Sequence, residues 1–446
     1  MQLQFRDLNL DKRILRALEE LNYTIPTPIQ EKVFSVAMSG VDLCGIAQTG
    51  TGKTLAYLLP LLNQWKYDKA REPQILILVP TRELVQQVVD VIKSLTVYLG
   101  ATVAGVYGGV NINTQRLQFA EGADVLVATP GRFYDLAVTG AFKVRSIKKL
   151  VIDEVDEMLN LGFRAQLRNI LDLLPLRRQN LLFSATLIPE VEELFESYFE
   201  RLQRVEAAPA GTPVEQVEQL AYELPNFHSK VNFLQWLLRE DASLQRIVVF
   251  SASKKQADEL AGLLEPIAPG QIGLIHSNKD QNHRFLTVRR FQGGELRVLV
   301  ATDIVARGID IAGVSHVINF DLPEAPEHYI HRIGRTGRAE QSGVAISLVT
   351  PFQSDRRAEL EAFLGGPLNV IPLPDAVPLS EVLLEEEMPK VPMKELSMKL
   401  PPKEERGASF HEKKAKNRKT NVVVSRKDRM MQKYGKPITR GAKKKR

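Results

Sequence analysis

Short apolar runs alternate along the chain with longer segments of helical period, and this alternation limits the folds available to it. Runs of five or six residues rich in Val, Ile and Leu are typical of strands that are buried on both faces of a parallel sheet. The runs form two series, at 41–46, 74–79, 124–128, 149–153 and 180–184, and then at 246–251, 272–276, 297–301, 316–320 and 344–349. The sequence therefore predicts an α/β fold with two parallel sheets in tandem.

The segments between these runs have the spacing of helices that cover a sheet. Leu84, Val88, Val91 and Leu95 are four, three and four residues apart, which places them on one helical face for burial. In open sheets of this kind, ligands bind at the carboxyl ends of the strands. Candidate functional residues are therefore expected there.

Breaks in the pattern predict the domain boundaries. The segment AAPAGTP, residues 207–213, has turn residues without apolar periodicity, so we expect a linker between a first domain of residues 1–206 and a second of residues 214–366. Prolines then recur and are interrupted by the acidic segment LLEEEM. We expect residues 367–408 to form a Pro-rich and acidic extension outside the packed domain.

The positive charge of the chain is concentrated at its end. Residues 409–446 contain 15 Lys and Arg and two acidic residues, a net charge of +13, whereas the whole chain carries +6 and residues 1–408 therefore carry −7. Such a segment predicts a disordered basic tail that is attracted to a polyanion, most often nucleic acid. A flexible terminus that only aids solubility is the alternative.

Composition argues against membrane and secreted classes. No run approaches the roughly 18 apolar residues of a membrane helix, and the first residues contain no apolar stretch of signal-peptide length, so we expect neither a membrane partner nor an export signal. Cys44 is the only cysteine, which excludes an intrachain disulfide and favours a cytoplasmic location. Its apolar neighbours predict a buried core thiol.

The segment AQTGTGKT has the context of a phosphate-binding loop, because it follows a predicted strand and precedes an apolar helical run. Glycines allow phosphate to approach the backbone, and N–H groups at a helix start favour an anion. Lys53 would neutralise the β and γ phosphates, and Thr54 would ligate Mg²⁺. A Gly-rich turn without a ligand is the alternative. The nucleotide-binding residues of this loop are Ala47, Gln48, Thr49, Gly50, Thr51, Gly52, Lys53 and Thr54.

The segment DEVD, residues 153–156, directly follows another predicted strand. Nucleotide hydrolysis needs an acid that holds the metal and a group that orients the attacking water. We expect Asp153 to reach Mg²⁺ and Glu154 to act on the water. An acidic cluster at a strand end can also be a solvated cap, but the phosphate loop favours the catalytic interpretation.

In the second half, HRIGRTGR places three arginines three residues apart in a segment broken by glycine. Guanidinium groups suit the charge that develops on a transferred phosphate. Arg335 and Arg338 are the candidate arginine fingers. A basic surface helix is the alternative, which the isoleucine and glycines disfavour.

Together with further motifs, these segments resemble a DEAD-box RNA helicase from about Phe5 to Leu348. The motifs are PTPIQ (26–30), AQTGTGKT (47–54), PTREL (80–84), Gly108-Gly109, TPGR (129–132), SAT (184–186), VFS (249–251), QNHR (281–284), ATDIVARGID (301–310) and HRIGRTGR (331–338). The resemblance implies two RecA-like domains that clamp RNA while ATP is hydrolysed in the cleft between them.

The resemblance also implies roles for individual residues. Gln30 would recognise the adenine edge, Phe5 would stack near the base, and Asp310 would hold the ribose. Hydroxyls, guanidinium groups and backbone suit phosphates and sugars and carry no base preference. The implied RNA-binding residues are Pro80, Thr81, Arg82, Gly109, Thr129, Gly131, Arg132, Arg284 and Thr302. The implied coupling residues between the domains are Ser184, Thr186, Asp156 and His331.

Three positions depart from the patterns. Val155 stands where the box of the family has Ala, and its larger side chain raises a question about coupling between the domains. Asn22 stands where the family usually has Gly, and Ala47 where the general phosphate-loop pattern has Gly. The carboxylates of the box are intact.

Two other functions stay open on the sequence alone: a DNA helicase of the same superfamily, and an RNA clamp or annealing protein that binds ATP as a switch with little turnover. The predicted function is RNA-stimulated ATP hydrolysis that unwinds RNA duplexes or remodels RNA–protein complexes. We expect a monomer that uses ATP and Mg²⁺.

Overall fold

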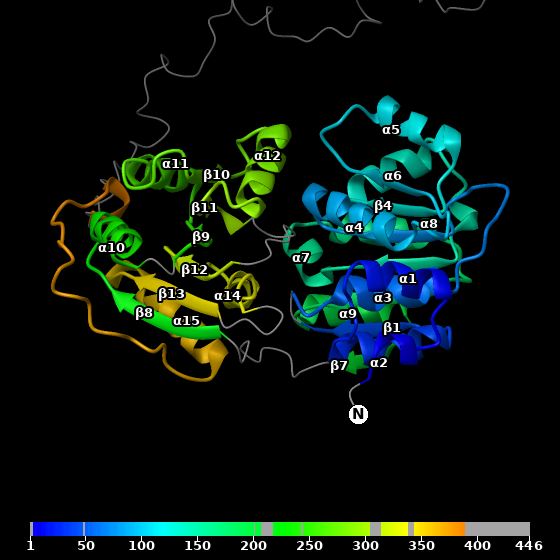
Figure 1. Cartoon of the computed structure of the whole chain (residues 1–446), viewed down its shortest axis with the longest axis horizontal. Helices are drawn as coiled ribbons and strands as arrows, with labels where there is room; N and C mark the ends of the chain where they lie inside the picture. Colours follow the sequence, from blue (N-terminus) through cyan, green and yellow to red (C-terminus); the bar gives the residue numbers. More distant parts are fainter. Residues whose placement is uncertain are drawn as a thin grey trace, which may run out of the picture. The chain divides into compact units, whose positions relative to one another are not determined.

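The computed structural model describes residues 3–47, 50–199, 201–206, 217–241, 244–303, 314–337 and 343–388. These residues form two α/β lobes, each built on one parallel sheet (Figure 1). Within the described residues, the first sheet has the strand order β3-β4-β2-β5-β6-β1-β7 and the second β10-β11-β9-β12-β13-β8. All ten predicted strands are present, so the predicted fold class is confirmed.

The first lobe contains the strands β1 (Leu43–Ile46), β2 (Ile75–Leu78), β3 (Val103–Val106), β4 (Val125–Ala128), β5 (Lys149–Ile152), β6 (Gln179–Ser184) and β7 (Gln203–Glu206). Its helices are η1 (Phe5–Asp7), α1 (Lys12–Glu20), α2 (Pro28–Met38), α3 (Lys53–Asn63), α4 (Arg82–Leu95), α5 (Ile112–Gln118), η2 (Phe119–Glu121), α6 (Pro130–Val138), η3 (Val144–Ser146), α7 (Val155–Asn160), α8 (Arg164–Leu173) and α9 (Pro189–Tyr198).

The second lobe contains the strands β8 (Val217–Glu223), β9 (Ile247–Phe250), β10 (Ile272–Ile275), β11 (Val298–Ala301), β12 (His316–Asn319) and β13 (Gly343–Val349). Its helices are α10 (Phe227–Glu240), α11 (Lys254–Leu264), α12 (Gln281–Gln292), α14 (Pro326–Ile333), η4 (Pro351–Gln353), α15 (Ser354–Leu364) and η5 (Glu385–Glu387).

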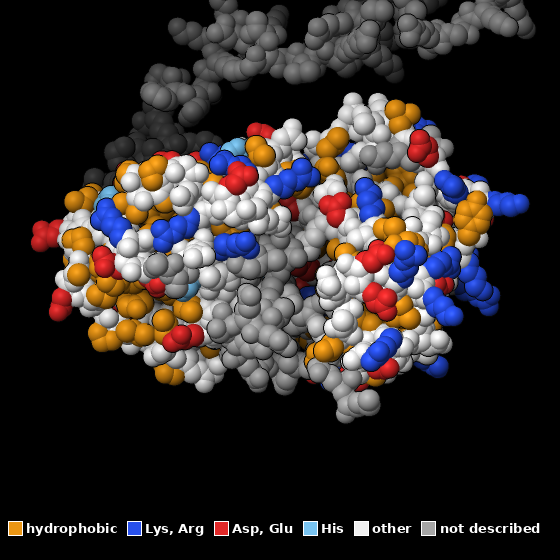
Figure 2. Space-filling model, in the orientation of Figure 1, with side chains coloured by type: hydrophobic (Ala, Val, Ile, Leu, Met, Phe, Trp, Pro, Cys, Tyr) orange, Lys and Arg blue, Asp and Glu red, His pale blue; other side chains and the backbone are white. Residues whose placement is uncertain are grey.

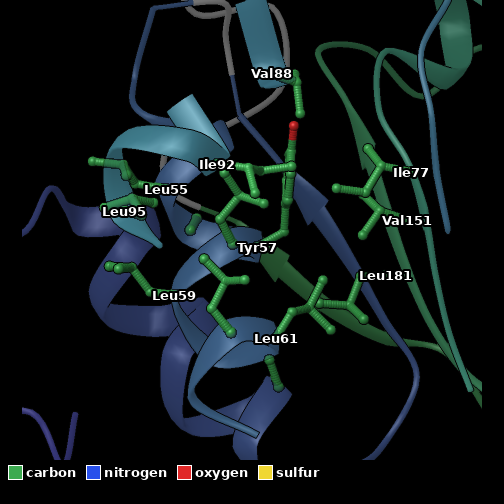
Figure 3. Packing of buried hydrophobic residues seen from close by; sticks show 14 of the residues in the cluster. Leu55, Tyr57, Leu59, Leu61, Ile77, Val88, Ile92, Leu95, Val151 and Leu181 are labelled. Carbon is green, nitrogen blue, oxygen red and sulfur yellow. The ribbon is translucent and has the colours of Figure 1, made fainter. Parts of the chain in front are cut away.

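The first sheet is buried on both faces because alternate strand residues enter different cores. In β2, Ile77 packs with helices α1 to α4, whereas Leu76 packs with helices α6 to α9. Of the predicted apolar face of α4, Leu84, Val88 and Leu95 are buried in the first of these cores, and Val91 packs against it partly buried. Figure 3 shows Tyr57 of α3 among aliphatic side chains from α4 and from the strands β2, β5 and β6.

This architecture gathers the predicted functional segments at one edge of the first sheet. The carboxyl ends of parallel strands meet at the same edge. Strands β1, β2, β4, β5 and β6 run directly into the segments AQTGTGKT, PTREL, TPGR, DEVD and SAT, respectively. The fold therefore supplies the common location that the sequence predicts.

Residues 367–388, here called the strap, pack against the second lobe (Figure 1). The Ala221 N–H donates to the Asn369 carbonyl at 2.8 Å, and the buried Val377 joins the core beside α10. The Glu387 carboxylate accepts a hydrogen bond from the Phe227 N–H at 2.7 Å, where acceptors are favourable at a helix start. The compact unit therefore continues to Met388, 22 residues beyond the boundary expected at residue 366.

Figure 2 shows both Lys or Arg and Asp or Glu side chains on the visible face of the two lobes. This mixture agrees with the strongly basic segment lying at residues 409–446, outside the described residues. In the described part of the chain, no helix has the length and apolar character needed to cross a bilayer.

Candidate functional site

The phosphate-binding loop leads from β1 into α3. Ala47 is buried, and its N–H donates to the Ser184 carbonyl oxygen at 3.1 Å. Gly50 and Gly52 have φ angles of 86° and 92°, in the left-handed region that glycine adopts without steric cost. Helix α3 then begins at Lys53, so the helix start faces the loop as the sequence predicts.

Lys53 is a buried cation at this helix start. Its side chain is 6% exposed, and its Nζ has no hydrogen-bond partner among the described residues. A positive charge is unfavourable at the N-terminus of a helix, where the macrodipole is already positive. A bound phosphate would compensate both the buried charge and the helix dipole. Thr54 follows in the first turn of α3 and is partly exposed.

Two buried carboxylates follow β5. Asp153 Oδ1 accepts the Glu154 N–H at 2.9 Å, and Glu154 has φ 52° and ψ 53°, a left-handed conformation that is uncommon outside glycine. Burial, and then the nearby Asp153, raise the pKa of Glu154 to about 7, while Lys53 and Arg335 oppose this shift. Burial also raises the pKa of Asp153, with Lys53 again opposing. A carboxylate with a pKa near neutrality has the property of a general base.

Asp156 links this box to the segment that follows β6. Its Oδ2 accepts hydrogen bonds from the N–H groups of Ala185 at 3.1 Å and Thr186 at 2.9 Å, and from the Thr186 hydroxyl at 2.9 Å. The Ser184 hydroxyl donates to the Thr186 carbonyl at 2.7 Å. Asp156, Ser184 and Thr186 are all buried. Three of the four predicted coupling residues therefore form one hydrogen-bonded unit.

Helix α14 of the second lobe and the turn after it bring His331 and Arg335 to this unit. His331 Nδ1 lies 2.9 Å from Glu157 Oε1, and its Nε2 lies 3.7 Å from Asp156 Oδ2. Arg335 is 5% exposed, and its Nε donates to the His331 carbonyl at 3.3 Å. Glu157 was not among the predicted site residues. Its signal in the sequence was only its place directly after DEVD.

The Gln30 side chain forms a hydrogen bond with the phosphate loop. Its Nε2 donates to the Gly52 carbonyl at 3.1 Å, and its Oε1 accepts the Thr27 N–H at 2.9 Å. A Cβ on Gly52 would lie 2.4 Å from Gln30 Nε2, so this approach requires glycine. Phe5 is 3% exposed and packs in the core, whereas Tyr23 is 47% exposed. Of these two aromatic side chains, Tyr23 has ring surface available for a base.

Two arginines of the predicted RNA surface lie against the loop and helix that follow β3. Gly109 has φ 80°, and a Cβ there would lie 2.2 Å from Arg82 Nη1, so the glycine allows the guanidinium to approach. Arg132 donates from Nη1 to Gln115 Oε1 at 2.6 Å and from Nη2 to the Val110 carbonyl at 2.9 Å. The structure therefore brings Arg82, Gly109 and Arg132 to neighbouring parts of one surface.

Helix starts provide other predicted RNA contacts in the first lobe. Thr81 and Thr129 are the N-cap residues of α4 and α6, and Pro80 is buried just before the first of them. Gly131 lies in the first turn of α6, with open space where a Cβ would be. Backbone N–H groups at helix starts are suited to phosphate oxygens.

The second lobe contributes Arg284 on α12 and Thr302 after β11. Arg284 Nη2 lies 2.8 Å from Glu83 Oε1 and contacts the Gln281 side chain. Gln281 Oε1 also accepts a hydrogen bond from Arg82 Nη1 at 3.3 Å. Arg82 and Arg284 therefore meet at one glutamine. Thr302 is 7% exposed, and no described contact joins it to this group.

Several predicted residues and segments lie outside the described residues. They are Gln48 and Thr49 of the loop, Asp310, Arg338, the linker 207–213, residues 389–408 of the predicted extension and the tail 409–446.

The structure accounts for the two residues, Val155 and Asn22, that differ from the usual family sequence. Val155 is fully buried in the core that also contains Cys44, on the α6 to α9 side of the sheet. Burial raises the pKa of Cys44 to about 12, which agrees with an inert core thiol. Asn22 has φ 60°, a conformation that asparagine tolerates better than most residues and glycine adopts freely.

Comparison with known families matches both lobes. Residues 27–194 match the DEAD/DEAH box helicase family, and residues 229–340 match the helicase conserved C-terminal domain. The first match covers the phosphate loop, DEVD and SAT, and the second covers His331 and Arg335.

Individual relatives share most of this length. The ATP-dependent RNA helicase DbpA of Bacillus subtilis is 36% identical over 370 residues, which are 83% of this chain and 76% of that protein. The DEAD-box ATP-dependent RNA helicase CshA of Geobacillus kaustophilus is 37% identical over 80% of this chain and 76% of its own length.

Solved structures with two RecA-like lobes also match. S. cerevisiae Dbp5 bound to RNA and ADP BeF3 has a TM-score of 0.73 and 29% identity, and the match covers 82% of this chain and 95% of that one. Mss116p bound to ssRNA and AMP-PNP has a TM-score of 0.77 and 25% identity, over 84% and 81%.

Proposed function

Because the chain belongs to the DEAD-box family of ATP-dependent RNA helicases, we propose that its two lobes close on ATP and an RNA backbone, so that hydrolysis unwinds duplexes or remodels RNA–protein complexes. The protein is an ATP-hydrolysing RNA helicase. One observation carries the mechanism. His331 of the second lobe lies 2.9 Å from Glu157 beside the acidic box of the first, where the positive charges of Lys53 and Arg335 also lower the pKa of the buried Glu154.

Lys53, Glu154 and Arg335 would each have a separate role in hydrolysis. Lys53 holds the β and γ phosphates at the start of α3. Glu154 orients the attacking water and accepts its proton, while Arg335 stabilises the charge that develops on the transferred phosphoryl group. Arg338 is proposed as a second arginine finger. Because Arg335 comes from the second lobe, hydrolysis requires the lobes to be closed.

A magnesium ion fits the oxygen atoms present in the first lobe. Mg²⁺ prefers oxygen ligands and is often held by one or two protein groups together with substrate phosphates. Asp153 supplies a buried carboxylate, and Thr54 a hydroxyl beside Lys53. When bound, the ion would neutralise charge on the β and γ phosphates. Asp153 and Thr54 are therefore the proposed metal-binding residues.

Nucleotide selection is proposed to involve Gln30, Phe5 and Asp310, with Tyr23 as an additional aromatic residue. The Gln30 contact with Gly52 supports a role in which adenine recognition also positions the phosphate loop. The burial of Phe5 supports an indirect role behind the base, while the exposed ring of Tyr23 supports direct stacking. Asp310 would bind the ribose.

RNA binding is proposed to run over Arg82, Gly109 and Arg132 of the first lobe to Arg284 and Thr302 of the second. Thr81, Thr129 and Gly131 would add helix-start contacts, with Pro80 placing the first of them. Dbp5 and Mss116p are both described bound to RNA and a nucleotide analogue, which supports RNA at the same lobes here. Contacts of these kinds read backbone and not base identity. We also propose a cytoplasmic monomer.

The function is tested by ATP hydrolysis with and without single-stranded RNA, together with displacement of a short RNA duplex. We expect RNA to stimulate hydrolysis and ATP to be required for strand displacement. A matched DNA duplex should be a poor substrate. Tight ATP-dependent RNA retention without turnover would favour the RNA clamp, and equal activity on DNA would favour the DNA helicase.

The basic tail is proposed to tether RNA without selecting it. For single strands, log K falls with log salt at a slope of roughly 0.7 per neutralised phosphate, so about seven engaged charges contribute a slope of roughly 5. Deleting residues 409–446 is therefore expected to reduce the salt slope of RNA affinity by roughly 5. A salt series on the full and shortened chains measures it. Equal slopes would show that the tail does not bind RNA.

The rate of ATP hydrolysis at saturating RNA is the matched control for this deletion. Every proposed catalytic residue precedes residue 340, so the maximal rate at saturating RNA should change little. Duplex displacement should weaken mainly when RNA is limiting. A collapse of the saturated rate would place the tail in the catalytic core.

A further inference from the structure

Glu157 is a buried carboxylate in the first turn of α7, and the proposed catalytic steps give it no role. It is 1% exposed. A buried charge is costly unless an opposite charge is near. His331 supplies that charge from the second lobe, with Nδ1 2.9 Å from Glu157 Oε1. Glu157 therefore forms an ion pair across the two lobes, next to the acidic box.

The second nitrogen of His331 faces the box itself. Nε2 lies 3.7 Å from Asp156 Oδ2, the oxygen that already accepts hydrogen bonds from Thr186. The group bonded to one imidazole nitrogen sets the orientation of the ring and the role of the other nitrogen. An imidazole with a carboxylate at each nitrogen is suited to carry two protons and a positive charge. Glu157 thereby directs His331 toward Asp156.

The charges around His331 favour its protonated form. Burial lowers its pKa, but Glu157 and then Asp156 and Glu154, all on or next to α7, outweigh burial, so the pKa is raised. Lys53 of α3 and Arg335 after α14 are the positive groups facing this cluster. Burial likewise opposes ionisation of Asp156, yet His331 and Lys53 hold its pKa below the ordinary value. These directions favour a negative charge on Asp156 in the first lobe and a positive charge on His331 in the second.

We propose that Glu157 is a positioning residue for ATP hydrolysis, which orients His331 and keeps it charged, so that the contact between the lobes weakens when His331 loses its proton. This inference rests on the proposed requirement for lobe closure. Glu157 itself touches neither ATP nor RNA in the proposed mechanism.

The sign of the pH dependence follows from the raised pKa of His331. A histidine with a raised pKa stabilises its contact fully below its ordinary pKa, and this stabilisation is lost as pH rises through the raised value. The RNA-stimulated rate of hydrolysis should therefore fall as pH rises, and this falling part of the pH profile is called the alkaline limb. Removing the charge of Glu157 should move this limb to lower pH, and one pH unit would correspond to a tenfold loss at fixed pH.

The direct test is the titration of His331 by NMR in the full chain labelled at its seven histidines. His331→Gln identifies the resonance. In Glu157→Gln the pKa of His331 is expected to fall relative to the unmodified protein. Asp258→Asn is the matched control, because it removes a different carboxylate 3.0 Å from a histidine, His276, and should leave the titration of His331 unchanged.

The functional test compares pH profiles of RNA-stimulated hydrolysis. Glu157→Gln should move the alkaline limb and raise the KM for RNA above that limb, whereas a merely structural role would lower the rate equally at every pH. In a His331→Gln background, Glu157→Gln should add little, since the partner is absent. Equal losses in both backgrounds, or an unchanged His331 titration, would overturn the proposal.

Two outcomes are kept separate by this design. If the unmodified protein lacked RNA-stimulated hydrolysis, the proposed function would fail, but NMR would still report on Glu157 and His331. If Glu157→Gln proved unstable in thermal unfolding, His331→Gln alone is expected to remove the alkaline limb. Persistence of that limb in His331→Gln would contradict the inference.

Discussion

Glu154→Gln is expected to bring RNA-stimulated ATP hydrolysis close to zero while binding of ATP and RNA is retained. The amide matches the carboxylate in size but cannot accept the proton of the attacking water. Loss of a general base typically lowers the rate by roughly 10²- to 10⁴-fold. Steady-state ATPase assays and separate binding measurements for ATP and RNA test this. Near-normal hydrolysis would contradict the assignment of Glu154.

Two further variants are compared with Glu154→Gln: one that also affects ATP binding, and one that serves as a surface control. Lys53→Ala should also weaken ATP binding, because it removes the cation at the phosphate loop. Glu193→Gln changes a surface glutamate on α9 that pairs with Arg164 and Arg168, and should leave hydrolysis unchanged.

The pKa of Glu154 also predicts that the glutamine variant stays folded. A carboxyl group with a pKa near 4.5 in the unfolded chain and about 7 in the folded chain binds more protons when folded. Its ionisation therefore lowers stability as pH rises from about 4.5 to about 7. Glutamine removes this penalty. Thermal unfolding of Glu154→Gln at pH 8 should match or exceed that of the unmodified protein.

Arg335→Ala is expected to lower RNA-stimulated hydrolysis by roughly a thousandfold or more, as loss of an arginine finger does in related phosphoryl transfer. The positive charge of Arg335 lowers the pKa of Glu154 from the second lobe, so we expect the loss to be mainly in kcat. Lysine should restore little, because a single ammonium group lacks the planar fork of arginine. Single-turnover hydrolysis at saturating ATP and RNA measures the effect.

Arg357→Ala is the control for charge removal in the second lobe. Arg357 lies on α15 in ion pairs with Glu223 and Glu361, and it is not among the proposed catalytic or RNA-binding residues. Its removal should leave the single-turnover rate unchanged. If Arg335→Ala and Arg357→Ala had similar small effects, Arg335 would not be an arginine finger.

Much of the fold could be predicted from local patterns, and the failures have physical causes. The ten apolar runs could be recognised as strands because most of these strands are buried on both faces, which leaves an unbroken hydrophobic signal. The strands β3, β7 and β8 were not predicted. Strand β7 is an edge strand with one buried residue, Val205, and β3 is interrupted by Gly105. Neither carries the continuous apolar signal of a central strand.

In the candidate site too, only features that a local sequence pattern encodes could be predicted. The proposed catalytic residues could be predicted because each occupies a fixed place in a short motif, at a strand end in the first lobe and after α14 in the second. Glu157 was not predicted, because its partner His331 belongs to another lobe and no local spacing encodes their contact. Nor could the sequence show that Phe5 is buried while Tyr23 is exposed, since that difference depends on how η1 packs against the rest of the first lobe.

The packing of the strap determines where the chain can be shortened. A protein ending at residue 366 would lose Val377 from the core, the hydrogen bonds of Ala221 to residues 369–371 and the Glu387 cap on α10. It would expose apolar surface and tend to aggregate for reasons unrelated to RNA. A protein ending at Met388 or later keeps these contacts. Truncations that isolate the tail should therefore begin beyond the strap, so that solubility and RNA affinity are measured on an intact second lobe.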